Sequence, residues 1–235
     1  MNLARIVTKL KKAVDTLSLK AKVSYSQSGE DRIADYFFES IGIKQPQYID
    51  IGANDPVKGN NTYFFYLKCC QGICIEPDSS LIPLLKKYRP HDLILNIGIS
   101  NTEASKAEFY SFEGHYNAWN TFSKKDALLK SKESGISFSQ SMVQLETINN
   151  IIQKYNFQQV NYLSIDVEGL DLDILKSIDF KQIKPEMICV ETIAFSLKNT
   201  INKNKEISNF MLSKDYIVYA DTNLNTLFCR KNLFF

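Results

Sequence analysis

The chain has 235 residues, of which 44% are hydrophobic, and a formal net charge of +2. It is long enough for one large domain with a buried core, and its small net charge gives no basis for nucleic acid as the main partner. Its five cysteines, an odd number without a C-x-x-C pair, predict buried free thiols in a reducing cytoplasm rather than disulfides or a zinc site. No apolar stretch approaches the roughly 20 residues that span a bilayer.

The first segment has the pattern of a basic amphipathic helix. Apolar residues recur at helical spacing from Leu3 to Leu17, with basic residues between them. Two interpretations stay open: a helix that rests on an anionic membrane or a partner, or one that packs on its own domain with a solvated basic face. Residues 1–45 are predicted as a helical extension, with a helix over 29–41 whose N-cap is Ser28.

The remaining residues, 46–235, alternate between strand and helix patterns. Strands are predicted at 47–51, 72–76, 91–96, 160–166 and 187–192, and helices at 62–70, 78–89 (capped by Asp78), 170–177 and 201–213. Two last strands, 215–219 and 225–230, form a hairpin. The pattern predicts an α/β, three-layer Rossmann-like fold whose sheet is mostly parallel with an antiparallel C-terminal hairpin.

A polar insert interrupts this alternation at about residues 105–145. Within it, 107–112 is predicted as an added edge strand and 124–132 as a short helix. The insert also carries His115, Tyr116 and Trp119. The pKa range of histidine suits a general base, and the aromatic rings suit stacking on a sugar, although a surface histidine and a small aromatic core are equally ordinary interpretations.

Two acidic strand ends near the start of the domain predict a nucleoside site. The first strand ends in Asp50 and runs into Gly52 and Asn54, and the second strand ends in Glu76. In an open α/β sheet, ligands bind at the carboxyl ends of the strands. Gly52 lets backbone approach a ligand closely, and Glu76 can accept both hydrogen bonds of a ribose diol. Asn96, at the end of the third strand, either faces the adenine or serves only in a turn.

The residues after the first strand favour one cofactor. A dinucleotide fold needs G-x-G-x-x-G, but Gly52 is followed by Ala53, Asn54, Asp55 and Pro56. Asp50 and Asp55 put negative charge where a pyrophosphate would sit. S-adenosylmethionine has a ribose, an ammonium and a sulfonium but no phosphate, so the sequence favours it over NAD.

A second acidic group follows two later strands. Asp166 and Glu168 lie on the same side of one strand end, and Glu191 ends the next strand. Two functions stay open: the three carboxylates hold a divalent cation, or one is a general base and the others bind the acceptor. The structural alternative is that Asp166 and Glu168 cap the helix at 170–177.

Six motifs in this order resemble the FkbM family of S-adenosylmethionine-dependent O-methyltransferases, which has the seven-stranded class I methyltransferase fold. They are YSQSGED at 25–31, YIDIGAN at 48–54, NTY at 61–63, EP at 76–77, NTFS at 120–123 and LSIDVEG at 163–169. The resemblance implies methyl transfer to a hydroxyl, usually on a sugar or polyketide, and for this branch a role in bacterial surface-polysaccharide synthesis. It also brings Gln27, Glu30 and Asp31 towards the cofactor.

The expected partner is therefore a small-molecule or glycan acceptor, met in the cytoplasm or at the inner face of the membrane. Two alternatives remain: an NAD- or nucleotide-sugar-binding enzyme, and a non-catalytic subunit that has kept the fold. The acidic turn at Asp50 and Asp55 argues against the first, and the presence of Asp50, Glu76, Asp166 and Glu168 together argues against the second.

Overall fold

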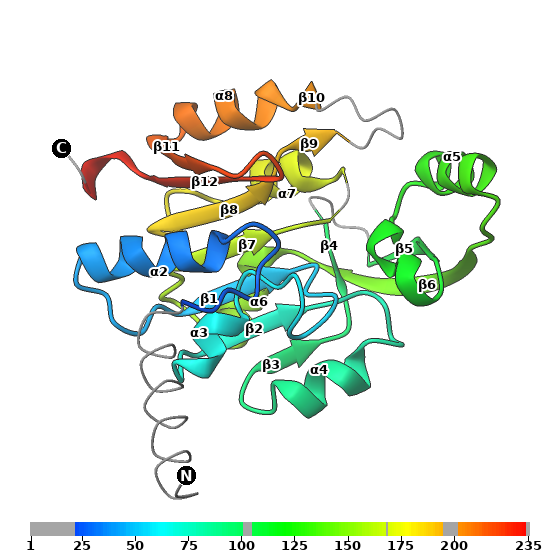
Figure 1. Cartoon of the computed structure of the whole chain (residues 1–235), viewed down its shortest axis with the longest axis horizontal. Helices are drawn as coiled ribbons and strands as arrows, with labels where there is room; N and C mark the ends of the chain where they lie inside the picture. Colours follow the sequence, from blue (N-terminus) through cyan, green and yellow to red (C-terminus); the bar gives the residue numbers. More distant parts are fainter. Residues whose placement is uncertain (1–21, 101–104, 168, 195–201, 234–235) are drawn as a thin grey trace, which may run out of the picture.

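The computed structural model describes residues 22–100, 105–167, 169–194 and 202–233. Its centre is a seven-stranded sheet in the order β3-β2-β1-β7-β8-β12-β11 (Figure 1). The strands are β1 (Tyr48–Ile51), β2 (Gly72–Ile75), β3 (Leu93–Leu95), β7 (Tyr162–Ile165), β8 (Met187–Glu191), β11 (Tyr216–Asp221) and β12 (Asn225–Arg230). The first five in the spatial order run parallel, and β12 pairs antiparallel with both β8 and β11. The predicted fold class is confirmed.

Helices cover both faces of this sheet, which gives three layers. On one face lie α2 (Glu30–Ser40), α3 (Tyr63–Leu67) and α4 (Ile82–Tyr88); on the other lie α6 (Ile148–Lys154), α7 (Asp171–Ser177) and α8 (Lys205–Ser213). In β1, Ile49 and Ile51 pack towards α6–α8, whereas Tyr48 packs with α2 and α3. Burial on both faces explains why these strands appear in the sequence as short continuous apolar runs.

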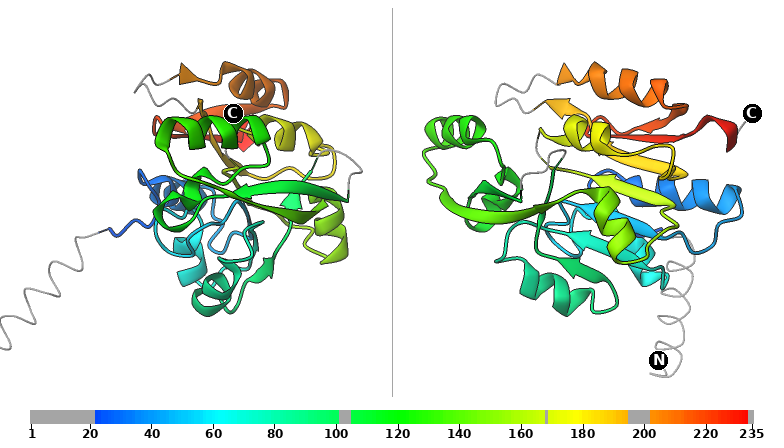
Figure 2. Two further views of the ribbon diagram at one scale, coloured as in Figure 1. Left: turned by 90° about the vertical axis from the view of Figure 1, so that its right-hand side faces the viewer. Right: turned by 180° about the vertical axis from the view of Figure 1, so that it is seen from behind.

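The insert builds a second, smaller sheet. It contains β4 (Gly98–Ile99), β5 (Lys106–Ser111), the 3₁₀ helix η1 (Gly114–Trp119), α5 (Lys124–Ser134) and β6 (Ser139–Glu146). The added edge strand predicted at 107–112 is β5; it lies at the edge of this second sheet, where it pairs antiparallel with β6, and β6 pairs with β4. Figure 2 shows the insert projecting from one end of the central sheet.

Three predicted helix starts were wrong. The N-cap of α2 is Gly29, at φ 92°, and the Ser28 N–H donates instead to Glu30 Oε2. Helix α4 begins at Ile82 rather than after Asp78, because Asp78 Oδ1 accepts from the Ser80 N–H and forms a turn. The helix predicted over 201–213 is α8, and it begins at Lys205.

Three further short elements complete the described chain: β9 (Ile193–Ala194), β10 (Asn202–Lys203) and the 3₁₀ helix η2 (Lys231–Leu233). The predicted amphipathic helix at the start of the chain lies outside the described residues. Of the predicted extension, α2 packs its Phe37 and Phe38 against Tyr48 and Tyr162 of the central sheet. No helix in the described ranges has the length and apolar character needed to cross a membrane.

Candidate active site

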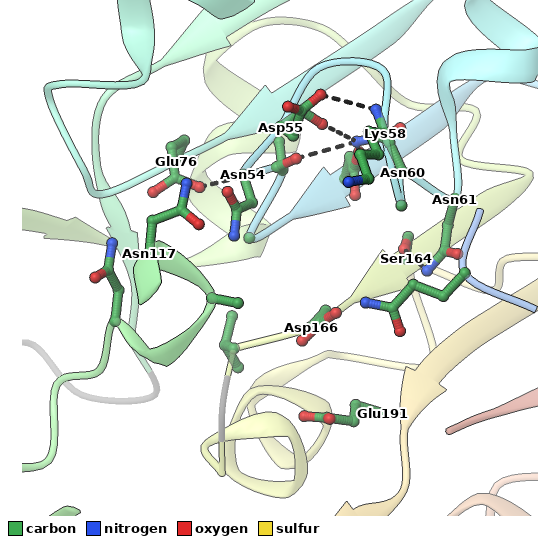
Figure 3. A pocket seen from close by; sticks show the side chains of 18 of the residues that line it. Asn54, Asp55, Lys58, Asn60, Asn61, Glu76, Asn117, Ser164, Asp166 and Glu191 are labelled. Atoms are coloured by element: carbon green, nitrogen blue, oxygen red, sulfur yellow. Dashed lines mark hydrogen bonds between the residues drawn. The ribbon is translucent and has the colours of Figure 1, made fainter. Parts of the chain in front are cut away.

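A cavity of about 990 Å³ lies at the carboxyl ends of β1, β2, β7 and β8. The insert and the segment just before α2 complete its walls. The lining includes six of the predicted cofactor or acceptor residues that the sheet and its loops supply, namely Asp50, Gly52, Asn54, Glu76, Asp166 and Glu191. Figure 3 shows Glu76 and Asn117 on one side of this cavity and Asp166 and Glu191 on another.

Glu76 is held ready by two backbone N–H groups. Its Oε2 accepts from Asn54 (2.8 Å) and its Oε1 from Asp78 (2.8 Å). Burial raises the pKa of Glu76 to about 7, although both hydrogen bonds lower it. Each oxygen keeps a second lone pair, so the side chain can accept two more hydrogen bonds from neighbouring hydroxyls. That capacity fits a ribose diol.

Asp50 is fixed from one side. Its Oδ2 accepts from Thr62 Oγ1 (2.7 Å), from Asn60 Nδ2 (3.0 Å) and from Arg89 Nη1 (3.5 Å). Burial raises the pKa of Asp50, against the Arg89 charge and the two other hydrogen bonds, which lower it. Because these bonds converge on one oxygen of a residue that lines the cavity, Oδ1 is the oxygen available to a ligand.

Arg89 is the main residue that sequence reasoning missed. Its side chain is fully buried, and its five N–H groups reach Asp92, Asn60, Asp50, Tyr48 and Thr62 at 2.7–3.5 Å. The guanidinium therefore joins β1 to the loop that follows it and to the start of β3. The signal in the sequence was weak: an arginine before a proline at a helix end is ordinary at a surface.

Several N–H groups of the loop after β1 already donate hydrogen bonds to other groups of the protein. Those of Val57 and Lys58 bind Asp55 Oδ1 at 2.8 and 2.7 Å, that of Asn54 binds Glu76, and that of Ala53 binds the Ile75 carbonyl. A pyrophosphate needs free N–H groups at this turn. The geometry therefore supports the argument against a dinucleotide that Asp50 and Asp55 suggest.

Gly52 serves the sheet as well as the cavity. It has φ +82°, and a Cβ at this position would lie 1.9 Å from the Asp166 carbonyl oxygen. The close approach that requires glycine is thus to the end of β7. By this contact, Gly52 brings Asp166 next to the β1 turn.

The predicted acceptor acids come from adjacent strand ends. Asp166 follows β7 and Glu191 ends β8; both line the cavity, together with Ser164. Helix α7 has Leu170 as its N-cap with no side-chain cap bond, and Asp171 instead accepts from the N–H groups of Val167 and Gly169. Asp166 is therefore not the helix cap. Glu168 lies outside the described residues.

The candidates in the insert lie around η1. His115 belongs to η1, and its side chain is outside the described part of the structure. Tyr116 is 40% exposed, and its ring lies 4.9 Å from that of Trp119, which also contacts Phe112 at 5.9 Å. Neither Tyr116 nor Trp119 is among the described residues that line the cavity, whereas their neighbours Asn117, Ala118 and Asn120 are.

The other candidates lie at the borders of the site. Gln27 lines the cavity. Glu30 and Asp31 are fully buried in the first turn of α2, where Asp31 accepts from Ser24, Tyr25 and Ser26 at 2.6–3.0 Å. These two acids thus hold the segment that presents Gln27. Asn96 is exposed outside the cavity lining, and its amide donates to the Glu76 and Pro77 carbonyls at 2.8 and 3.0 Å.

Asn61 begins the NTY motif, but the sequence analysis gave it no role in the site. Its Nδ2 donates to Ser164 Oγ (3.2 Å), and its buried Oδ1 has no hydrogen-bond partner. Within the described ranges, no group of three or more His, Cys, Asp or Glu side chains is arranged to hold a metal ion. The site as described offers a diol acceptor, strand-end carboxylates and no phosphate cradle, which fits a nucleoside that carries a cationic group.

Comparisons with solved structures found similar chains of low identity. A TehB-like SAM-dependent methyltransferase from Corynebacterium glutamicum is 8% identical, with a TM-score of 0.43 over 98% of this chain and all of that chain. A methyltransferase from Geobacter sulfurreducens is 11% identical, with a TM-score of 0.43 over 98% of this chain and 97% of that chain. Such values are too low to carry an argument about activity. No curated protein matches the chain.

A family comparison is decisive. The model of the methyltransferase FkbM domain matches residues 50–218, well over half of the chain. The match begins at the end of β1 and includes the loop after it, Glu76, the insert and both acceptor-side strand ends. The chain therefore belongs to the FkbM methyltransferase domain family.

Proposed function

We propose that this chain is an S-adenosylmethionine-dependent O-methyltransferase that modifies a hydroxyl of a sugar in bacterial surface-polysaccharide synthesis. The observation that carries the proposal is Glu76, a buried carboxylate with two oriented oxygens at the edge of the cavity. Family membership supports methyl transfer. The sequence resemblance is the basis for the sugar acceptor and the pathway. The sequence pattern is the basis for the cytoplasmic location and for membrane contact through residues 1–20.

The residues of the chain divide the work in this proposal. S-adenosylmethionine supplies a methyl group on a sulfonium when it is bound. Glu76 would accept hydrogen bonds from the ribose hydroxyls, and Asp50 Oδ1 would attract the cationic end of the cofactor, with Gln27, Gly52 and Asn54 also lining this part of the cavity. Arg89 keeps Asp50 in place. Asn96 supports the Glu76–Pro77 backbone from outside.

On the acceptor side, methyl transfer would need a base to take the proton of the hydroxyl as the new O–C bond replaces the S–C bond of the cofactor, which would leave as S-adenosylhomocysteine. We assign this role to Asp166, next to the β1 turn, with Glu168 and His115 as the alternatives. Glu191 hydrogen-bonds the acceptor, and Tyr116 and Trp119 supply aromatic surface at its rim. A divalent cation held by Asp166, Glu168 and Glu191 remains the second hypothesis for this end of the site.

Calorimetric titration with S-adenosylhomocysteine, with NAD as the control ligand and with magnesium present or absent, tests the cofactor. We expect micromolar binding of S-adenosylhomocysteine alone, about −8 kcal/mol. Preference for NAD, or no binding, would contradict the proposal. A gain in affinity with magnesium would favour the metal hypothesis.

The Asp166→Asn variant tests the chemistry. We expect S-adenosylhomocysteine affinity within a few-fold of the wild type and a loss of turnover of about 10²–10⁴-fold, the range for general acid–base catalysis. Turnover is measured as S-adenosylhomocysteine release with a panel of sugars, nucleotide sugars and lipid-linked glycans. Asp173→Asn, at an exposed acid on α7, is the matched control. Equal rates in the two variants would remove Asp166 from the mechanism.

A further inference from the structure

Asn120 joins the ribose side of the cavity to the insert. Its Nδ2 donates to Asp78 Oδ2 (2.9 Å), and its Oδ1 accepts from the Phe112 N–H (2.8 Å). The Asp78 N–H in turn donates to Glu76 Oε1 (2.8 Å). A continuous run of hydrogen bonds therefore leads from the carboxylate that we assign to the ribose, through Asp78 and Asn120, to the backbone beside η1.

Asp78 and Thr121 extend this connection on the two sides of Asn120. Asp78 is 9% exposed, and its bond to the amide of Asn120 is charge-assisted, which makes it stronger than a bond between neutral groups. Beyond Asn120, the Thr121 peptide exchanges two hydrogen bonds with Tyr110 of β5, at 2.9 and 3.0 Å. These contacts connect the Glu76–Asp78 turn to both η1 and β5, and both elements contribute residues to the wall of the cavity.

We propose that Asn120 is a positioning residue that couples cofactor binding at Glu76 to the placement of the insert over the acceptor side of the cavity. The inference rests on the proposed function. A nucleoside that draws on the Glu76 oxygens changes the bond from Asp78, and Asn120 carries the change to η1. Because coupling is reciprocal, the acceptor changes the affinity for the cofactor by the same factor by which the cofactor changes the affinity for the acceptor.

The chain contains its own reporter of this movement. Trp119, its single tryptophan, directly precedes Asn120 and packs against Phe112 and Tyr116. Since the Phe112 N–H donates to Asn120 Oδ1, the surroundings of Trp119 depend on that hydrogen bond. Its fluorescence can therefore be followed without knowing the acceptor.

The test measures calorimetric heat and Trp119 fluorescence in the same titration of the full chain with S-adenosylhomocysteine. In the wild type we expect a change in Trp119 emission that saturates together with the calorimetric heat. In Asn120→Ala we expect binding within a few-fold of the wild type but at most half of the emission change. Asp78→Ala should lose the same part of the signal, and the double variant no more. Gln140→Ala, an exposed residue on β6 of the same insert, serves as the control and should respond like the wild type.

The outcomes separate the inference from the proposed function. Binding of S-adenosylhomocysteine with no emission change in the wild type, or with a full change in both Asn120→Ala and Asp78→Ala, would overturn the coupling and leave the cofactor assignment intact. Failure of the wild type to bind would overturn both. Loss of the signal in the two variants, with binding retained, would establish Asn120 as the coupling residue.

Discussion

The burial of Glu76 sets the pH range in which the site can hold a diol. Its pKa lies at about 7, above the ordinary value of 4.5 that applies to the unfolded chain. Between these two values the folded protein binds more protons than the unfolded one, so its stability without ligand falls as the pH rises through this window. Above the window, Glu76 is ionised and can accept both ribose hydroxyls.

We therefore expect affinity for adenosine to rise as the pH increases through about 7 and then level off. Adenosine has the ribose diol but no amino-acid group, so its own charge is constant over this range. Glu76→Gln should remove the pH dependence and weaken binding by about 10- to 100-fold, since hydrogen bonds to a charged group contribute about 1.5–3 kcal/mol. Calorimetric titration with adenosine from about pH 5.5 to about 8.5, a range that includes the pKa of Glu76, measures the affinity of the wild type and of the variant. A parallel pH profile in wild type and variant would exclude Glu76 as the titrating group.

Arg89 provides a second prediction for a single side chain. Lysine has three N–H donors where the guanidinium has five, so Arg89→Lys loses at least two of the buried hydrogen bonds that the guanidinium donates. At about 1 kcal/mol or more for each lost bond, the free energy of unfolding should fall by at least about 2 kcal/mol. Urea denaturation measures it. The same change at Arg230, a half-buried partner of Glu186, should cost less than about 1 kcal/mol; equal losses would refute the role given to the Arg89 network.

Among the elements, the junction of β1 and β7 allows the clearest test. Gly52 and Gly42 both have positive φ, +82° and +79°, but a Cβ has no neighbour within 4 Å at Gly42 and meets the Asp166 carbonyl at 1.9 Å at Gly52. Gly42→Ala should lower stability by about 1–2 kcal/mol, the cost of the left-handed conformation alone.

Gly52→Ala should cost a further 1–3 kcal/mol, roughly the penalty for overpacking, because the end of β7 must move. Asp166 moves with it, so turnover should fall more than cofactor affinity. Denaturant unfolding and activity assays on the two alanine variants check both statements. Similar stability for the Gly42→Ala and Gly52→Ala variants would mean that the end of β7 can move with little loss of free energy.

Elements with a simple burial pattern were predictable from the sequence, and others were not. The runs at β1, β2, β7 and β8 are buried on both faces, so the apolar letters alone mark them. In β6, Val143 is the one buried residue in eight, so that strand has no clear alternation and was missed. Helix starts were wrong where the local chemistry forms a turn first, as Asp78 does with Ser80.

For the molecule as a whole, the burial of the thiols predicts how fast each cysteine reacts with a disulfide reagent. Cys69 is exposed, and Cys70, Cys74, Cys189 and Cys229 are buried. Burial raises the pKa of Cys70 and Cys229 to about 11, which disfavours their reactive thiolate forms. An aromatic disulfide reagent should therefore modify one thiol per native chain within minutes and the others only with unfolding.

The Cys69→Ser variant should lose the fast phase completely. Absorbance of the released thiolate, with and without urea, follows both populations. More than one fast thiol in the wild type would show that the core opens locally around the others.

The candidate site was predictable where it depends on strand ends and not where it depends on convergence. Asp50, Glu76, Asp166 and Glu191 line one cavity because parallel strands end at one edge. Arg89 and Asn61 enter through contacts with residues far along the chain, which no spacing announces. The assignment of Gly52 to a ligand contact missed the strand against which it packs.

The anchoring of Glu30 also bears on how the protein is made. Its carboxylate accepts from Thr222 and Asn225, which lie 192 and 195 residues further along, and so ties the segment holding Gln27 to the β11–β12 turn. During synthesis the strands that end in Asp50 and Glu76 leave the ribosome long before that turn does. A nascent chain thus carries Glu76 and Asp50 without the wall that Glu30 secures. If these residues bind the cofactor as proposed, we expect binding only after the β11–β12 turn has been made.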